Sequence, residues 1–145
     1  MTRRNLLLVA ALFGLVNLPA AAEETMPLAK PRVLVVTGGH GFDRPAFFQV
    51  FKDNPNLSYR EVQHTNAHAL LTPEAAVSYD LIVLYDMWQP ITAEARSNFI
   101  AVLQSGKGLV ATHHCLAGYQ DWDEYRRIIG GRYYLKDTTV DGTRR

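Results

Sequence analysis

Three short apolar segments of this chain end abruptly in polar residues, and this pattern constrains the fold more than any other feature. Apolar runs of this length are typical of strands buried on both faces of a parallel sheet. The carboxyl ends of parallel strands share one edge, and in open α/β sheets that edge holds the ligand site. The three segments, 33–37, 81–84 and 109–111, run into Gly38-Gly39-His40, Tyr85-Asp86-Met87-Trp88 and Thr112-His113-His114-Cys115.

Helical patterns alternate with these strands. Residues 44–51 place three phenylalanines on one face, and Asp43 stands where a helix cap belongs. This alternation predicts an α/β fold with a mostly parallel sheet and right-handed crossovers. The other expected elements are a strand at 57–62, a helical turn from Thr72, a helix capped by Thr92, a helix at 120–129 ended by Gly130, and a last strand at 132–135.

Residues 1–22 have the design of a signal peptide. Arg3 and Arg4 precede an apolar stretch at 6–18, and small residues follow at a cleavage position. That stretch is short for a membrane span, so we expect no stable membrane anchor after cleavage and a periplasmic or secreted protein. An uncleaved anchor is the alternative, and Thr2-Arg3-Arg4 also partly matches a twin-arginine signal. Residues 23–31 are expected to be a flexible lead-in, and the domain is predicted over 32–145.

Charge and cysteine content narrow the class of protein. Removal of residues 1–22 takes two arginines from the 15 basic residues, so 13 face 14 acidic ones and the net charge becomes −1. This near-neutral balance gives no basic stripe for nucleic acid. One cysteine cannot form an internal disulfide, so the domain depends on its packed core.

The chain carries a series of motifs at 33–40, 79–85, 106–110 and above all 113–122, continuing to 130–133. In order and spacing, these motifs resemble the ThuA-like (trehalose-utilisation) domain family. The resemblance spans roughly 31–135 and implies membership of the class I glutamine amidotransferase-like superfamily, with a flavodoxin-like three-layer sandwich and a link to carbohydrate metabolism. Family domains run longer than this chain, so we expect a domain that is incomplete at its C-terminus.

The strand ends supply the candidate site residues. His113 and His114 are predicted as catalytic residues, because an imidazole is the natural acid–base group near neutral pH. In an extended segment the two would point to opposite sides, whereas a bent elbow would bring both toward the cleft. The predicted substrate-binding residues are of three kinds. Glycines let the backbone come close to a ligand, polar side chains can bond sugar hydroxyls, and aromatic rings can pack on sugar rings. These residues are Gly38, Gly39, His40, Asp86, Trp88 and Tyr119.

No metal and no cofactor are predicted. His40, His113 and His114 make zinc conceivable, but these three offer no tight i, i+4 pair and no clear carboxylate partner. His64 and His68 lie near a loop and are expected to face solvent. Trp122 is expected in the core of the helix that contains it.

The leading functional hypothesis is an exported hydrolase or lyase that acts on a carbohydrate or an oxidised sugar by histidine acid–base chemistry. Its expected partner is a small-molecule carbohydrate, and the sequence leaves open whether the chain forms a homo-oligomer. A non-catalytic sugar-binding or interaction module is the first alternative, and a poorly folded fragment is another. A third is an amidotransferase-like cysteine hydrolase, but Cys115 has bulky His113 two residues before it, so a packed, inert thiol is expected.

Overall fold

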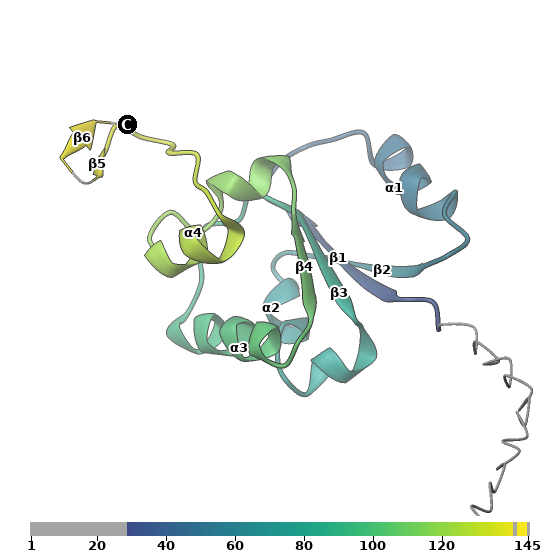
Figure 1. Ribbon diagram of the computed structural model, residues 1–145. Coiled ribbons are helices and arrows are strands. Elements are labelled where there is room, and N and C mark those ends of the chain that lie inside the picture. Colours follow the sequence, from purple (N-terminus) through teal and green to yellow (C-terminus); the bar gives the residue numbers. More distant parts are fainter. Residues whose placement is uncertain (1–28, 141, 145) are drawn as a thin grey trace, which may run out of the picture.

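A parallel four-stranded sheet forms the centre of the molecule (Figure 1). The computed structural model describes residues 29–140 and 142–144, so the expected signal peptide and most of the lead-in lie outside the described residues. The strand order is β2-β1-β3-β4, and all three pairings are parallel. This confirms the predicted α/β class. The strands are β1 (Arg32–Gly38), β2 (Ser58–Gln63), β3 (Leu81–Asp86) and β4 (Gly108–Ala111).

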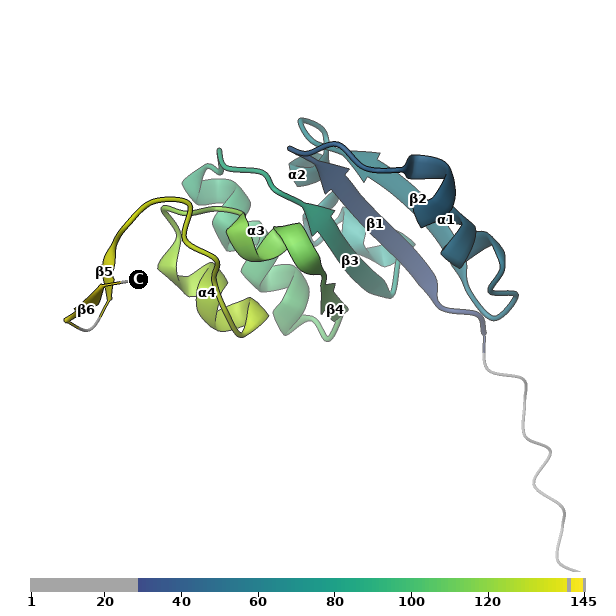
Figure 2. The ribbon, with the colours of Figure 1, turned by 90° about the horizontal axis from the view of Figure 1, so that it is seen from above.

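Helices cover both faces of this sheet and confirm the flavodoxin-like sandwich. Figure 2 shows α1 (Arg44–Lys52) on one side and α3 (Ala93–Gln104) and α4 (Asp123–Ile129) on the other. The side chains of each strand alternate between the two faces. In β1, Val33 and Val35 pack with Phe48 of α1, whereas Leu34 and Val36 belong to the larger core on the opposite face. Short helical segments complete the fold: α2 (Ala67–Leu70), η1 (Ala75–Ser78) and η2 (His113–Ala117).

Local sequence explains where the helices begin and end. The Asp43 side chain accepts a hydrogen bond from the amide of Ala46, and Thr92 caps α3 through the amide of Ala95, both at 3.1 Å. Gly130, at φ 80°, ends α4 in the left-handed region that glycine adopts without strain. These predicted caps are confirmed. Trp122 is buried in the core, also as expected.

The prediction of a strand at 132–135 is wrong. The amide of Tyr133 donates to the carbonyl of Leu116 at 2.8 Å, and the amide of Leu135 donates to the Gln120 side chain at 3.2 Å. These hydrogen bonds hold the segment 132–135 against η2, so it does not pair with a strand of the sheet. The chain instead ends its described part in a small antiparallel hairpin, β5 (Thr139–Val140) with β6 (Thr143–Arg144), which stands apart from the main sheet (Figure 1).

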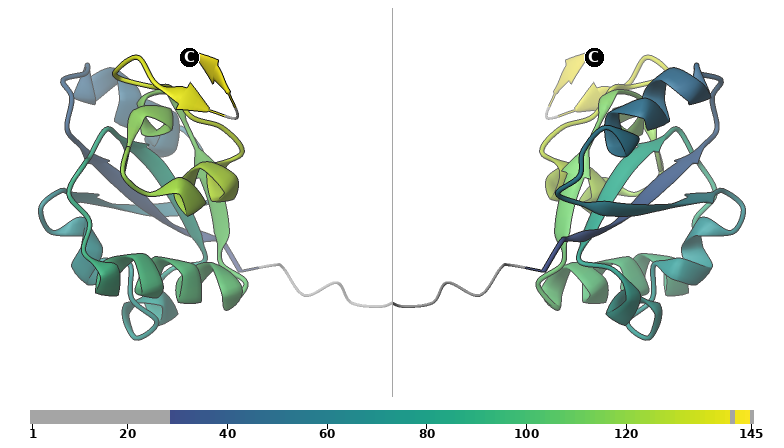
Figure 3. Two further views of the ribbon diagram at one scale, coloured as in Figure 1. Left: turned by 90° about the vertical axis from the view of Figure 1, so that its left-hand side faces the viewer. Right: turned by 90° about the vertical axis from the view of Figure 1, so that its right-hand side faces the viewer.

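The parallel topology brings the polar strand ends together. The four strands run toward the end of the molecule that carries η2 and the C-terminal hairpin, opposite the point where the described chain enters β1 (Figure 3). Register confirms this, because Gly38 pairs with Asp86 at the last rung between β1 and β3. Among the described residues, no helix has the length and apolar character needed to cross a membrane.

Candidate functional site

Three histidines from two strand ends form a cluster at the carboxyl edge of the sheet. His40 follows β1, and His113 and His114 begin η2 after β4. The ring centroids of His40 and His114 lie 4.1 Å apart, and those of His113 and His114 lie 4.0 Å apart. The Tyr85 ring meets His40 edge-on at 4.9 Å. The three imidazoles therefore lie together, as the parallel direction of the strands predicts.

A sharp turn after β4 places both neighbouring histidines on the same side. The Thr112 hydroxyl donates to the carbonyl of Leu84 at 2.6 Å, and the Cys115 amide donates to the carbonyl of Thr112 at 3.1 Å. His113 has φ 45°, a conformation that non-glycine residues rarely adopt and that costs on the order of 1–3 kcal/mol. Of the two arrangements left open for this pair, the bent elbow is the one observed.

Main-chain carbonyls orient the His40 ring. Its Nε2 lies 3.2 Å from the carbonyl oxygen of Tyr85, and its Nδ1 lies 3.2 Å from that of Gly41. The preceding glycines serve packing. Gly39 has φ 82°, and a Cβ there would overlap the main chain of Met87, while a Cβ on Gly38 would come within 3.1 Å of the His64 Cβ. The glycines thus let the His40 loop lie directly on the end of β3.

The environment of His114 favours its neutral form. Loss of solvent around the ring, followed by the neighbouring charges of His40 and His113, lowers its pKa below the ordinary value of 6.5. A neutral imidazole can accept a proton, so His114 is suited to act as a general base at neutral pH.

The predicted substrate-binding residue Asp86 is buried against His64. Its Oδ2 lies 3.0 Å from Nε2 of His64, and the side chains of Asp86 and His64 are 1% and 0% exposed. The expectation that His64 faces solvent is wrong, because the His64 amide donates to the carbonyl of Thr37 at 2.9 Å and continues the β1–β2 ladder inward. Among the described residues, Asp86 Oδ1 and His64 Nδ1 have no hydrogen-bond partner.

Tyr119, Trp88 and His68 complete this buried network. The Tyr119 hydroxyl lies 3.0 Å from Nε2 of His68 and 3.3 Å from Nε2 of His64, and the Trp88 ring stacks on His64 with 5.0 Å between centroids. His68 is half-buried, so the expectation that it faces solvent is also wrong. Tyr119 is 3% exposed, so its ring offers no open face to a sugar. Burial and the charge of Asp86 raise the pKa of Tyr119, which keeps its hydroxyl protonated.

One feature of the sequence could have revealed this network. His64 and His68 are four residues apart, and small or apolar residues lie next to His68 at positions 67 and 69–71. Such a pattern is typical of a buried turn of helix rather than a solvated loop. The partner carboxylate could not be found locally, because Asp86 lies 22 positions further along the chain.

Cys115 is packed under the elbow. Its side chain is fully buried, and Tyr125 donates a hydrogen bond to its carbonyl at 3.1 Å. Burial, then the nearby charge of Asp86, raises the pKa of the thiol to about 11. A nucleophilic cysteine needs the opposite change. The expected packed thiol therefore agrees with the structure, and the geometry gives no support to cysteine hydrolysis.

Alkylation tests this state of the thiol. We expect Cys115 in the folded chain to resist iodoacetamide at neutral and mildly alkaline pH, because the thiolate is scarce and the sulfur is inaccessible. After unfolding in urea the same residue should react fully, as measured by intact-protein mass. Rapid labelling of the folded chain at mildly acidic pH would contradict this reading and favour a catalytic thiol.

Within the described residues, no group of three or more His, Cys, Asp or Glu side chains is placed to hold a metal ion. No family model, curated protein or solved structure matches the chain. The ThuA-like resemblance therefore rests on the sequence motifs, and functional inference rests on the site itself.

Proposed function

We propose that this chain is an exported carbohydrate-processing domain of the ThuA-like type, in which His114 acts as the acid–base group of a hydrolase or lyase. The observation that carries the proposal is the cluster of three imidazoles from two strand ends at the carboxyl edge of the sheet, with centroids 4.0 and 4.1 Å apart. That edge is where open α/β sheets bind their ligands.

The three histidines have different roles in this proposal. His114, with its lowered pKa, takes a proton from a substrate hydroxyl or an activated water. His113 and His40 both pack against it, and His40 is held by the carbonyl of Tyr85. In this proposal the imidazoles act by general acid–base catalysis.

A small cavity beside His40 offers room for the substrate. Its volume is about 260 Å³, and its lining includes Gly38, His40, Arg44 and Gln63. His114 is not part of this lining but packs against His40, which is. This size is close to the lower end of small-molecule sites, which suits a monosaccharide unit. Arg44 and Gln63 each donate to Glu61, and their remaining N–H groups supply donors for hydroxyl groups. Asp86 is buried beneath the edge, so in this proposal it supports the site through His64 rather than touching the sugar.

A sugar-binding module without catalysis is the second candidate. The observation that favours it is the commitment of Asp86 to His64, which leaves this carboxylate unavailable to the histidine cluster. Acid–base hydrolases of sugars commonly use paired carboxylates. The two candidates differ in one respect, because only the enzyme loses turnover when His114 is removed.

Turnover of unmodified and oxidised sugars by the purified chain tests the proposal. The His114→Ala variant should lose on the order of 10²–10⁴-fold in kcat, the usual contribution of a positioned acid–base group. The rate should fall as pH drops through the lowered pKa of His114, because protonation removes the base, and should level off near neutral pH.

Leu116→Ala is the matched control, since Leu116 is exposed on the same η2 segment. It should leave the rate unchanged. Full turnover by His114→Ala would overturn the assignment. Sugar binding by the unaltered chain, measured by thermal shift, without turnover of any sugar would favour the binding module.

A further inference from the structure

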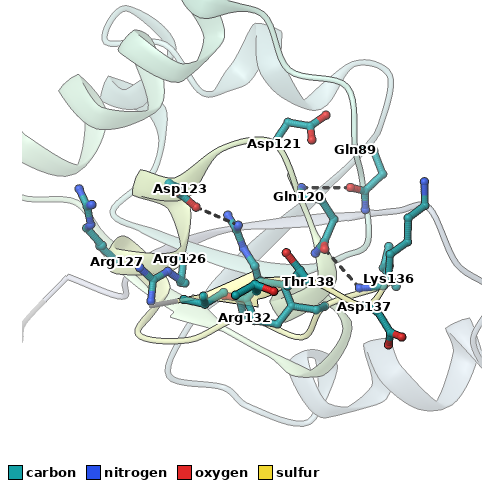
Figure 4. A pocket seen from close by; sticks show the side chains of 14 residues that line it. Gln89, Gln120, Asp121, Asp123, Arg126, Arg127, Arg132, Lys136, Asp137 and Thr138 are labelled. Atoms are coloured by element: carbon teal, nitrogen blue, oxygen red, sulfur yellow. Dashed lines mark hydrogen bonds and ion pairs between the residues drawn. The ribbon is translucent and has the colours of Figure 1, made fainter. Parts of the chain in front are cut away.

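A large pocket of the described chain lies away from the histidine cluster. It has a volume of about 880 Å³ and lies between α4 and the segment 132–140 (Figure 4). Its size is that of a small-molecule site. The lining residue Gln89 connects the pocket to η2. Its side-chain NH₂ donates to the carbonyl of Ala117 at 2.8 Å, and its side-chain oxygen accepts from the Gln120 amide at 3.2 Å.

The lining of this pocket carries uncommitted positive charge. Among the described residues, no hydrogen bond or ion pair engages the side chains of Arg126, Arg127 or Lys136. Two of the three acidic lining residues are already paired. Asp123 accepts from Arg132 at 3.1 Å, and Asp137 pairs with Arg144. Within the described part of the chain, three cationic side chains therefore share the pocket with one carboxylate that has no partner there, that of Asp121.

A buried guanidinium lies in the wall. The Arg132 side chain is 5% exposed, and one Nη donates to the carbonyl of Trp122 at 2.6 Å while the other reaches Asp123. Its Nε is buried and has no partner among the described residues. Asp123 itself is 77% exposed, so it neutralises this cation weakly. A buried cation with incomplete pairing is costly, and an anion in the pocket would offset that cost.

We infer that this pocket binds a small hydroxylated molecule that carries an anionic group, namely a sugar bearing a carboxylate or a phosphate. Arg126 and Arg127 would hold the anion, because guanidinium groups match carboxylate and phosphate oxygens in bidentate geometry. Lys136 adds a point charge from the following segment. The Tyr134 ring, 5.8 Å from the Arg132 guanidinium carbon, supplies an aromatic face in the same lining. The choice of a sugar as the carrier of the anion rests on the proposed function, whereas the preference for an anion does not depend on the chemistry of His114.

Calorimetric titration of the full chain at low ionic strength tests the site, with glucuronate, inorganic phosphate and glucose as probes. The unaltered chain should bind glucuronate or phosphate at least roughly tenfold more tightly than glucose, and added salt should weaken that binding. The double variant Arg126→Gln/Arg127→Gln should weaken it by about tenfold or more, because charged hydrogen bonds are lost. These side chains are not buried, so the variant should fold.

Lys30→Gln/Lys52→Gln is the control, since it removes the same net charge from exposed residues elsewhere. It should leave the affinity within about twofold. Binding of glucuronate alone identifies a carboxylate as the preferred group, and binding of phosphate alone identifies a phosphate. Equal affinity for glucose and both anions, equal weakening in the control, or no binding of either anion would overturn the inference. Loss of turnover in His114→Ala has no bearing on this result.

Discussion

Replacing Asp86 with alanine is expected to lower the free energy of unfolding by about 1–3 kcal/mol, the usual cost of leaving a buried hydrogen-bonding group without its partner. The side chains of Asp86 and His64 are 1% and 0% exposed, and their polar atoms lie 3.0 Å apart. Without Asp86, the His64 donor loses its acceptor in a place that water cannot easily reach. The Tyr119 hydroxyl, 3.3 Å from the same nitrogen, is a weaker substitute.

Urea denaturation measures this loss as a lower midpoint with an unchanged slope. Asp80→Ala is the matched control, because Asp80 precedes the same strand but forms an exposed ion pair with Arg32. Its effect should be much smaller, since exposed pairs contribute little. The double variant Asp86→Leu/His64→Leu should recover much of the loss, because apolar side chains remove both buried polar groups. An Asp86→Ala midpoint equal to that of Asp80→Ala would show that the buried pair contributes nothing.

Replacing Gly39 with alanine should cost about 2–5 kcal/mol, the combined price of two effects. Gly39 has φ 82°, where a side chain costs about 1–2 kcal/mol. The new Cβ would also overlap the main-chain carbonyl of Met87, and such overpacking costs about 1–3 kcal/mol more. The atoms in the way belong to the main chain of Met87, so the clash is relieved only if the loop that contains Gly39 moves. His40, the next residue, would move with it.

The measurement pairs a urea titration with the chemical shift of the His40 ring protons. Gly41→Ala is a close control in the same loop, because no atom lies within 4 Å of a Cβ at that position. Its stability should change by less than about 1 kcal/mol. If Gly39→Ala and Gly41→Ala have the same midpoint, the close approach between the His40 loop and Met87 is not a constraint on this fold.

Local sequence predicted the elements that a local pattern marks. Apolar runs identified β1 and β3, whose burial on both faces is typical of a parallel sheet. The run at 109–111 identified β4 but not its exposure, because β4 is an edge strand and Val110 is 43% exposed. The caps at Asp43 and Thr92 were read from side chains that satisfy amides only three residues away. The segment 132–135 has the composition of a strand, yet its amides bond to Leu116 and Gln120. Partners that lie 15 or more positions away cannot be read from a local pattern.

For the histidine cluster and the buried Asp86–His64 network, too, the sequence determined one part and the tertiary structure another. The sequence by itself placed His40, His113 and His114 at one edge, because parallel strands must end together and each histidine follows a strand closely. Only the tertiary structure decided that Asp86 turns inward to His64, that Tyr119 is buried, and that the elbow at His113 brings both imidazoles to one side. The parallel direction of the strands sets the edge of the sheet at which a strand-end residue lies. Packing between distant segments sets whether its side chain meets water or another polar group.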